Sequence, residues 1–431
     1  MNSSFGIHQR VRPALRQYAV VSLLFVATGT AAQEPLSLPE ALKLAESRST
    51  LLVGSDFAAQ AARERGIAAA QLPDPVLKFG LDNVPINGPD QYSLTADFMT
   101  MRRVGVMQEI SSPEKRDLRR RRGEVEAERE IAVREATRAG LRTDVALAWI
   151  DRYYAQKTAD LWRVFAADVE LQITALQAGI ANGRSNAPEL RAAEVVAAQT
   201  ADQISAAEQQ ARMSTAAIAR WLGPAAARPP GPAPDAATLA FDPDDPAVLA
   251  RLPQITVLRQ ESALAQTDLR LAEHGRTPDW SVEVAYQQRG PAYSNMVSIG
   301  VAIPLPMFPQ ERQDRGIAAS QAQVAQAEAQ LQDMQVQRGA ELATNVEEWR
   351  SLQRRAKALQ RTLLPYASDR AVQALASYSG GNGTLAGVLE ARRGSVDARM
   401  QVLLLERDAA RAWAKLNFAL VDGAQRTRSA P

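Results

Sequence analysis

The chain has 431 residues, a formal net charge of only +2, no cysteine and two histidines. This composition excludes disulfide bonds, thiolate metal sites and cysteine nucleophiles, leaves little material for histidine chemistry, and gives no indication of a nucleic-acid partner. Aromatic residues make up 5% of the chain, and long tracts rich in alanine, glutamine, arginine and glutamate favour extended helices over a compact aromatic core.

The N-terminus has the pattern of a secretory signal peptide over residues 1–32. Three arginines within residues 10–16 precede an apolar stretch over residues 18–27, and small residues follow up to Ala32. The alternative is an uncleaved membrane anchor, although the apolar stretch is too short to span a bilayer. We expect no later transmembrane helix, so the exported chain would be periplasmic, secreted or inserted in the outer membrane.

A proline-rich stretch over residues 223–246 is predicted to be a linker between two structural repeats, residues 33–222 and 247–421. Residues 422–431 are predicted to form a disordered tail. Both repeats follow the same order of elements, which indicates an internal duplication. In each, a helix and a proline-marked break precede two strands, a very long helix, a glycine-containing turn and a second long helix.

In the first repeat, the predicted elements are a helix over Leu38–Leu72, strands over Val76–Asp82 and Tyr92–Ile110, a helix from Pro113 to about Ile180, and a returning helix whose first turn holds Pro188. The returning helix carries a seam of mostly small residues with alternating steps of three and four, which favours close helix packing. The seam consists of Ala197, Thr200, Ile204, Ala207, Ala211, Ser214, Ile218 and Trp221.

In the second repeat, the predicted elements are a helix over Gln254–His274, strands over Trp280–Gln287 and Met296–Ile303, a helix from about Asp314 to Ser377, a turn over residues 379–384, and a last helix to about Leu420. A helix of about 65 residues is about 95–100 Å long, which exceeds the diameter of a globular domain. Such helices must therefore lie along one another as a coiled coil or a helical tube.

The strands of the second repeat alternate apolar residues with small or polar ones, as lipid-facing strands of a water-filled barrel do. An ordinary antiparallel sheet on a soluble core has the same pattern. Four strands are too few to form a closed barrel around a water-filled lumen. Three chains would therefore have to share one barrel of twelve strands. The predicted lipid-facing residues are Trp280, Val282, Val284, Tyr286, Val297, Ile299, Val301 and Ile303.

This order of elements, together with the signal peptide, resembles the outer-membrane efflux protein family typified by TolC. The resemblance covers about Leu36 to Leu420 and is carried also by two helix-to-helix turns. In the first turn, Gly183 precedes the run 188–192 (PELRA), and in the second, residues 378–383 (YSGGNG) precede 388–391 (VLEA). The fold class that we expect is mainly helical with β: a long antiparallel helical barrel plus four strands of a trimeric transmembrane β-barrel.

The resemblance implies a passive duct in the outer membrane that extends into the periplasm. It implies a homotrimer, a periplasmic adaptor protein and an inner-membrane pump of the resistance-nodulation-division type. The helix tips would be the adaptor-docking sites, and flow would be controlled by their opening. The predicted docking residues are Gly183, Pro188, Leu190, Gly381, Gly383, Val388 and Leu389.

The first half most resembles channels of heavy-metal resistance systems, in the segments 71–75 (QLPDP), 97–103 (DFMTMRR) and 107–109 (MQE). Many members of that group carry a lipid-modified cysteine, which this chain lacks. A closed barrel inserts without a lipid anchor, so the difference concerns anchoring and not the channel.

The resemblance to heavy-metal resistance channels implies heavy-metal cations as the cargo. Drug efflux or type I protein secretion through the same duct are alternatives.

Two residue groups have a second interpretation. Met99, Met101 and Met107 could bind a soft metal ion, but as strand or loop residues they equally fill apolar surface, and we predict no metal site and no cofactor. The run Arg119–Arg122 fits a solvated helix face or a contact with anionic lipid. The chain has no Walker loop, dinucleotide fingerprint, HExxH or GxSxG motif, so we predict no enzyme. The remaining alternative is a periplasmic coiled-coil adaptor or scaffold.

Overall fold

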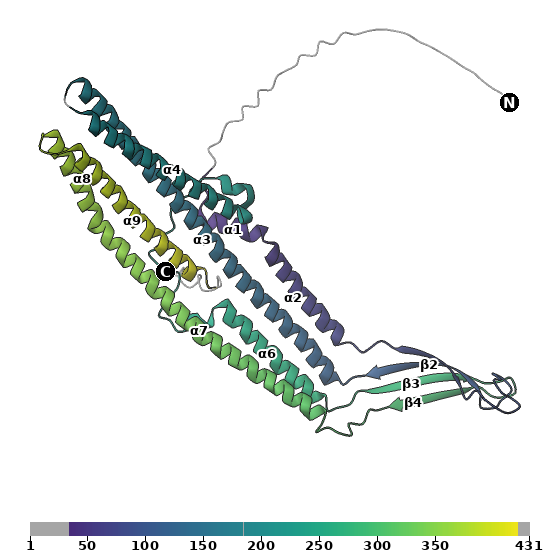
Figure 1. Ribbon diagram of the computed structural model, residues 1–431. Coiled ribbons are helices and arrows are strands. Elements are labelled where there is room, and N and C mark those ends of the chain that lie inside the picture. Colours follow the sequence, from purple (N-terminus) through teal and green to yellow (C-terminus); the bar gives the residue numbers. More distant parts are fainter. Residues whose placement is uncertain (1–33, 184, 421–431) are drawn as a thin grey trace, which may run out of the picture. The chain divides into compact units, whose positions relative to one another are not determined.

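A computed structural model describes residues 34–183 and 185–420. The predicted signal peptide, the tail and Arg184 lie outside the described residues. Figure 1 shows long helices and one antiparallel sheet, which the chain enters once in each half. The expected class, helical with a smaller β part, is confirmed.

The first half contains the predicted elements in the predicted order. Pro113 begins the longest helix, and Ser112 caps it by accepting a hydrogen bond from the Lys115 amide at 3.2 Å. The elements are α1 (Leu38–Arg48), α2 (Thr50–Ala69), β1 (Val76–Asp82), β2 (Met101–Ile110), α3 (Pro113–Ala181) and α4 (Ala187–Leu222).

The second half repeats this order after a short 3₁₀ helix, η1 (Gly223–Ala227). The predicted strands and the helix before them are confirmed to within two residues at each end. The elements are α5 (Ala247–Ala250), α6 (Pro253–His274), β3 (Trp280–Gln288), β4 (Met296–Ala302), α7 (Gln313–Arg361), α8 (Leu363–Ser379) and α9 (Leu385–Asn417).

Two helices that the sequence predicted as continuous are broken. The expected helix over 38–72 divides at Ser49, whose extended backbone ends α1 and whose hydroxyl accepts from the Leu52 amide at 3.4 Å to begin α2. The expected helix from 314 to 377 divides at Thr362, between α7 and α8. Pro365 explains this second break, because proline has no amide hydrogen to donate to the carbonyl of Arg361.

The expected strand over 92–110 was too long by nine residues. Residues 92–100 form turns, and only 101–110 pair with neighbouring strands. Tyr92 has a φ of 57°, outside the extended region. The Asp97 carboxylate accepts from the amides of Met99 at 2.8 Å and Thr100 at 3.1 Å, and this local turn prevents a ladder.

The two halves are anchored in the same way, which supports a duplication. The Trp149 indole donates to the carbonyl of Leu36 at 3.1 Å, and the Trp349 indole donates to the carbonyl of Ala236 at 3.1 Å. Each bond joins residues 113 apart in sequence. Equivalent residues therefore lie 200 apart (349 − 149 and 236 − 36), and Pro113 at the start of α3 corresponds to Gln313 at the start of α7.

The proline-rich stretch 223–246 is packed against the helices. Leu239 and Phe241 are buried in the main core with Trp149 and Trp413, and Leu36 and Pro230 form a parallel bridge. The indole of Trp413 donates to the carbonyl of Thr238 at 2.8 Å. The stretch connects the halves and also covers the middle of the helical layer; the domain boundaries themselves stay a prediction.

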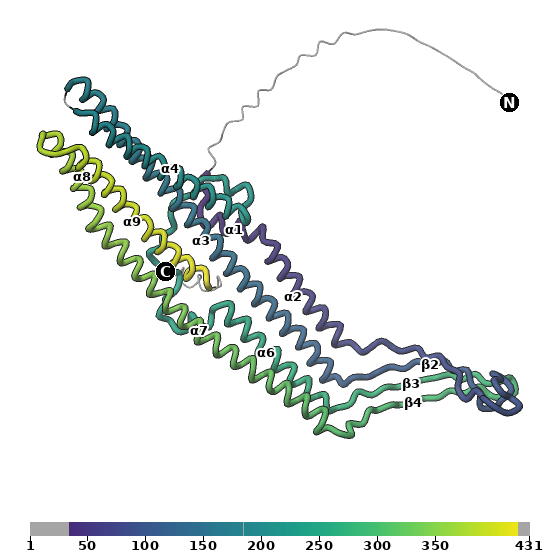
Figure 2. Tube along the Cα trace, viewed as in Figure 1, coloured from purple at the N-terminus to yellow at the C-terminus, as the bar shows by residue number. Residues whose placement is uncertain are grey.

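The helices form a layer with two free edges. Near the sheet, α2 packs on α3, α3 on α6, and α6 on α7, while toward the hairpin tips α4 packs on α3, α3 on α9, and α9 on α8 (Figure 2). The sheet repeats this order as β1-β2-β3-β4, all antiparallel. β1 and α2 thus lie at one edge of the chain, and β4 and α7 lie at the other.

Candidate functional site

One face of the sheet is a continuous apolar surface. The register places Val282 opposite Val301, Val284 opposite Ile299, and Tyr286 opposite Val297. Ile299 is 75% exposed and Val297 is 67% exposed, so none of residues 34–183 and 185–420 covers this face. Strands β1 and β2 extend it with exposed Leu77, Phe79, Val104 and Val106. The predicted lipid-facing residues also include Trp280 and Ile303, which are exposed, and Val282, which is half-buried.

The opposite face carries an ionic cluster that the sequence analysis missed. The ammonium of Lys78 lies 2.7 Å from the Glu283 carboxylate, and Arg103 pairs with Glu283 at 3.6 Å and with Asp82 at 3.2 Å. These four residues tie β1, β2 and β3 together. The alternation of Lys78 and Asp82 with Leu77, Phe79 and Leu81 was the signal that could have revealed it.

Close backbone contact supports the middle of the polar face. A Cβ on Gly105 would lie 2.8 Å from the Cβ of its cross-strand partner Ala285, which is buried. The two small residues therefore leave this face flat between the charged side chains. One apolar and one polar face is the arrangement of a wall between lipid and a water-filled lumen.

The two hairpin tips have the turns that helix reversal requires. Gly183 has a φ of 68° and Gly381 a φ of 77°, values that favour glycine. Asn186 caps α4 by accepting from the Glu189 amide at 3.0 Å, while the Glu189 carboxylate accepts from the Asn186 amide at 3.4 Å. Glu189 is therefore a capping residue, and Pro188 occupies the first turn as predicted.

Two predicted docking residues are not on the surface. Val388 is 1% exposed and Leu389 is 5% exposed, because both pack with Leu176 and Ile173 of α3 in a core between the two hairpins. Leu190 is half-buried against the same core. Gly183, Pro188, Gly381 and Gly383 are exposed as expected. Other apolar side chains in this part of the body are exposed, among them Val164, Leu171, Ile180, Val195, Val372 and Leu375.

A cavity of about 730 Å³ lies between α3, α4 and α9, nearer the middle of the body. Tyr154 lines it, and burial raises the pKa of this phenol well above its usual value. Asp151 of α3 and Arg411 of α9 also line it and form an ion pair across the helices. Nearby, burial raises the pKa of Glu406, although a hydrogen bond from Gln360 of α7 opposes the shift.

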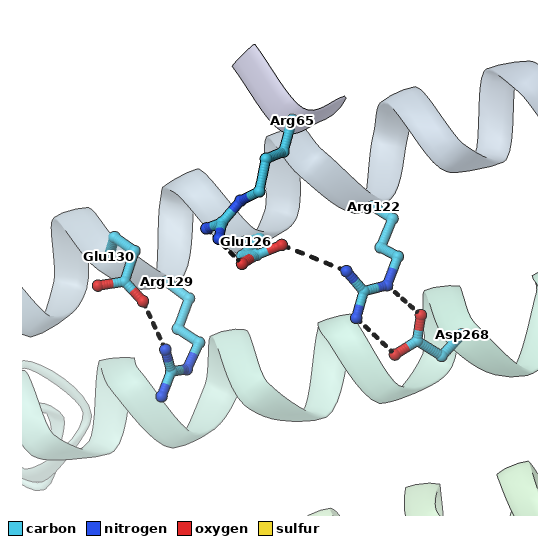
Figure 3. Close-up of polar contacts among 6 residues, drawn as sticks. All are labelled: Arg65, Arg122, Glu126, Arg129, Glu130 and Asp268. Atoms are coloured by element: carbon cyan, nitrogen blue, oxygen red, sulfur yellow. Dashed lines mark hydrogen bonds and ion pairs between the residues drawn. The ribbon is translucent and has the colours of Figure 1, made fainter. Parts of the chain in front are cut away.

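Three arginines of the run at the start of α3, Arg120, Arg121 and Arg122, form ion pairs. Arg120 and Arg121 both pair with Glu124, and Arg122 lies 2.6 Å from Asp268 of α6. Figure 3 shows Arg122 and Arg65 of α2 converging on Glu126, at 3.2 Å and 3.0 Å. These contacts favour the interpretation of a charged helix face that joins α2, α3 and α6, rather than a free lipid-binding patch.

The methionines do not form a cluster. Met101 and Met107 share the polar face of β2, but six residues of strand separate them by about 20 Å at 3.3 Å per residue. Met99 lies in the turn before β2. Over residues 34–183 and 185–420, no group of three or more histidine, aspartate or glutamate side chains could hold a metal ion.

Helix α3 contains one 18-residue stretch that is long and apolar enough to cross a membrane by length and composition. We expected no such stretch after residue 32, so that expectation was wrong. Helix α3 packs against α2, α4, α6 and α9, although only 22% of this stretch is buried. Length and composition alone do not establish a membrane span.

Known proteins share both the sequence pattern and the fold. Residues 246–421 match the family model described as outer membrane efflux protein. The cobalt-zinc-cadmium resistance protein CzcC of Cupriavidus metallidurans is 26% identical over 293 residues, which cover 64% of this chain and 68% of the relative. The second half of the chain is therefore similar to the outer membrane efflux protein family.

Solved structures agree with this assignment at the level of the fold. A membrane protein from Pseudomonas aeruginosa has a TM-score of 0.74 at 18% identity, with 89% of this chain and 93% of that chain covered. CusC has a TM-score of 0.72 at 17% identity, with 94% of this chain and 98% of that chain covered. The family match and the CzcC relative, together with this fold, identify the chain as a non-enzymatic efflux duct of the outer membrane that reaches into the periplasm. Proteins of this family act with an adaptor and an inner-membrane pump.

Proposed function

We propose that three copies of the efflux protein form one channel with a shared twelve-stranded barrel and a helical tube. The observation that carries the proposal is the four-stranded sheet with a bare apolar face and two unpaired edges, β1 and β4. An unpaired edge in lipid leaves amide and carbonyl groups without hydrogen bonds, which is too costly to persist. Pairing β4 of one copy with β1 of the next satisfies both edges.

The helical layer supports the same head-to-tail contact. Its edge helix α2 exposes Leu51 (70%) and Phe57 (65%), and the opposite edge helix α7 exposes Val336 (69%). Because the exposed surfaces differ between the two edges, contact between them is heterologous and closes only as a ring. A ring of three continues from the barrel into the tube.

The helix tips are the proposed site of adaptor docking. The exposed turn residues Gly183, Pro188, Gly381 and Gly383 are the proposed contacts, while Leu190, Val388 and Leu389 support them from the core between the hairpins. The adaptor would couple the tube to an inner-membrane pump of the resistance-nodulation-division type. Separation of the two hairpins at this core would open the tube.

Heavy-metal cations are the proposed cargo. The similarity to a cobalt-zinc-cadmium resistance protein supports this choice. The polar face of the sheet contributes two basic and two acidic residues in its cluster, a balanced charge that presents little barrier to a passing cation. A duct needs no tight site, because tight binding would slow release.

The test begins with fractionation of cells that express the full chain, followed by electrophoresis of the outer-membrane fraction with and without heating. We expect a trimer that dissociates on heating, and a soluble periplasmic monomer would overturn the channel. A deletion strain should then lose tolerance to cobalt, zinc or cadmium salts and regain it with the wild-type chain. Unchanged metal tolerance with lost drug tolerance would overturn the cargo alone.

A further inference from the structure

The loop end of the sheet carries two arginines whose charge no carboxylate neutralises. Arg102 lies near the start of β2, and Arg289 directly follows β3. Within the described part of the chain, neither guanidinium forms an ion pair, whereas their neighbour Arg103 pairs with both Asp82 and Glu283. The nearby carboxylate of Asp97 is occupied by backbone amides of its own turn.

The two arginines are held next to each other. The Arg102 guanidinium donates to the carbonyl oxygen of Arg289 at 3.3 Å. The Arg289 guanidinium donates to the carbonyl of Phe98 and lies 5.0 Å from the ring centre of Tyr293. Backbone and aromatic contacts thus fix both groups in place without neutralising them, which leaves two adjacent positive charges.

Their position relative to the apolar face identifies the ligand. Arg102 pairs with Leu81 and Gln288, and its register places it on the same face as Val104 and Val106. It is therefore the point at which the apolar face changes to a basic one. The loops beside it expose Tyr92 (68%) and Phe98 (55%), residue types that gather where a barrel meets the membrane surface.

We propose that Arg102 and Arg289 bind the phosphate groups of the phosphorylated glycolipid that forms the outer leaflet of the outer membrane. The proposal rests on the proposed function, because it needs the sheet to span this membrane with its helices toward the periplasm. The loop end of the sheet then faces the cell exterior, opposite the helices (Figure 1). Guanidinium groups form paired, charge-assisted hydrogen bonds with phosphate oxygens, and a low-dielectric boundary strengthens them.

The experiment uses the full-length trimer, purified in detergent and exchanged into nanodiscs. Bound glycolipid is measured by native mass spectrometry, and the temperature of trimer dissociation is followed as diphosphorylated glycolipid, its dephosphorylated form or inorganic phosphate is added. The variants are Arg102→Gln/Arg289→Gln, Arg102→Lys/Arg289→Lys, and the single change Arg102→Gln, which leaves the loop contact of Arg289 intact. Arg212→Gln, an exposed arginine of α4, is the matched control.

We expect the wild type and the control to retain the diphosphorylated glycolipid, the double glutamine variant to bind it about tenfold more weakly, and the lysine variant to lie between them. The proposal would be overturned if the double glutamine variant and Arg102→Gln both retained the glycolipid as well as the wild type does. So would equal binding of the dephosphorylated form, or competition by inorganic phosphate at similar concentrations. Outer-membrane trimers without this preference would refute only the lipid site, while absence of trimers from the wild type would refute the proposed function.

Discussion

The two long hairpins repeat the same order of elements but differ in continuity. Helix α3 runs unbroken through 69 residues, whereas its counterpart divides into α7 and α8 around Thr362. Sixteen residues after each anchoring tryptophan (149 to 165 and 349 to 365), the first half has Phe165, which is 2% exposed, and the second has Pro365. One repeat thus uses this position for core packing, and the other uses it to interrupt the helix.

The break at Thr362 predicts which part of the proposed tube moves. A continuous helix transmits rotation along its whole length, while a break allows the segment beyond it to pivot. The segment beyond Thr362 is α8, which packs on α9 and reaches the tip turn at Gly381. The second hairpin is therefore expected to move and the first to stay fixed when the tips separate.

The largest expected effect concerns the core between the hairpins. Leu389→Asp should unfold the tip region, because a carboxylate in a site that is 5% exposed loses its hydration without gaining a partner. Leu389→Ala should lower the free energy of unfolding by about 2–4 kcal/mol. Chemical denaturation of the purified trimer measures both, and Leu171→Asp, at a site 70% exposed, is the control that should leave stability nearly unchanged. A stable Leu389→Asp tip would mean that this core does not hold the hairpins together.

The second prediction removes the break itself. Pro365→Ala restores an amide donor and should join α7 and α8, making the second hairpin as continuous as the first. We expect a narrower distribution of distances between spin labels placed on the two tips, and reduced efflux with normal outer-membrane insertion. Phe165→Ala, at the matching position, should instead cost about 3–5 kcal/mol of stability and create no pivot. Identical distance distributions in Pro365→Ala and the wild type would rule out a hinge at this site.

A smaller effect is expected at Glu406, which accepts a hydrogen bond from Gln360, one residue before the end of α7. Burial raises the pKa of Glu406, so the folded protein binds a proton more readily than the unfolded chain. Above the pKa of Glu406 in the folded protein, the buried carboxylate is ionised and lowers the free energy of unfolding. This free energy should therefore increase as the pH falls through that pKa. Glu406→Gln should remove this pH dependence and leave neutral-pH stability equal or slightly higher, as thermal unfolding across pH 4 to 8 would test. An unchanged pH profile in the variant would assign the dependence to another group.

The smallest expected effect compares the helices nearer the sheet. In the first half, Arg65 of α2 pairs with Glu126 of α3, while in the second half α6 and α7 are joined by a 3.4 Å hydrogen bond between Gln266 and Glu328. Arg65→Gln should lower the free energy of unfolding by less than about 1 kcal/mol, since this arginine is well exposed. The difference between variant and wild type should vanish at high salt. Denaturation midpoints at low and high salt measure it, and a salt-independent loss would indicate packing rather than charge.

The sequence predicted the element order, its repetition in the two halves and the alternation of the strands, because these follow from local periodicity and from proline and glycine positions. It also placed Pro113 and Pro188 in the first turns of their helices, where a missing amide hydrogen costs nothing.

The exposure of the tip residues, in contrast, depends on contacts between distant segments. Val388 and Leu389 lie one after the other on a helix next to a turn, and nothing local shows that α3 covers them. The same holds for the cluster of Lys78, Arg103 and Glu283, since cross-strand register brings together residues up to 205 positions apart. Burial and charge pairing depend on contacts between distant segments, and periodicity within one segment does not contain that information.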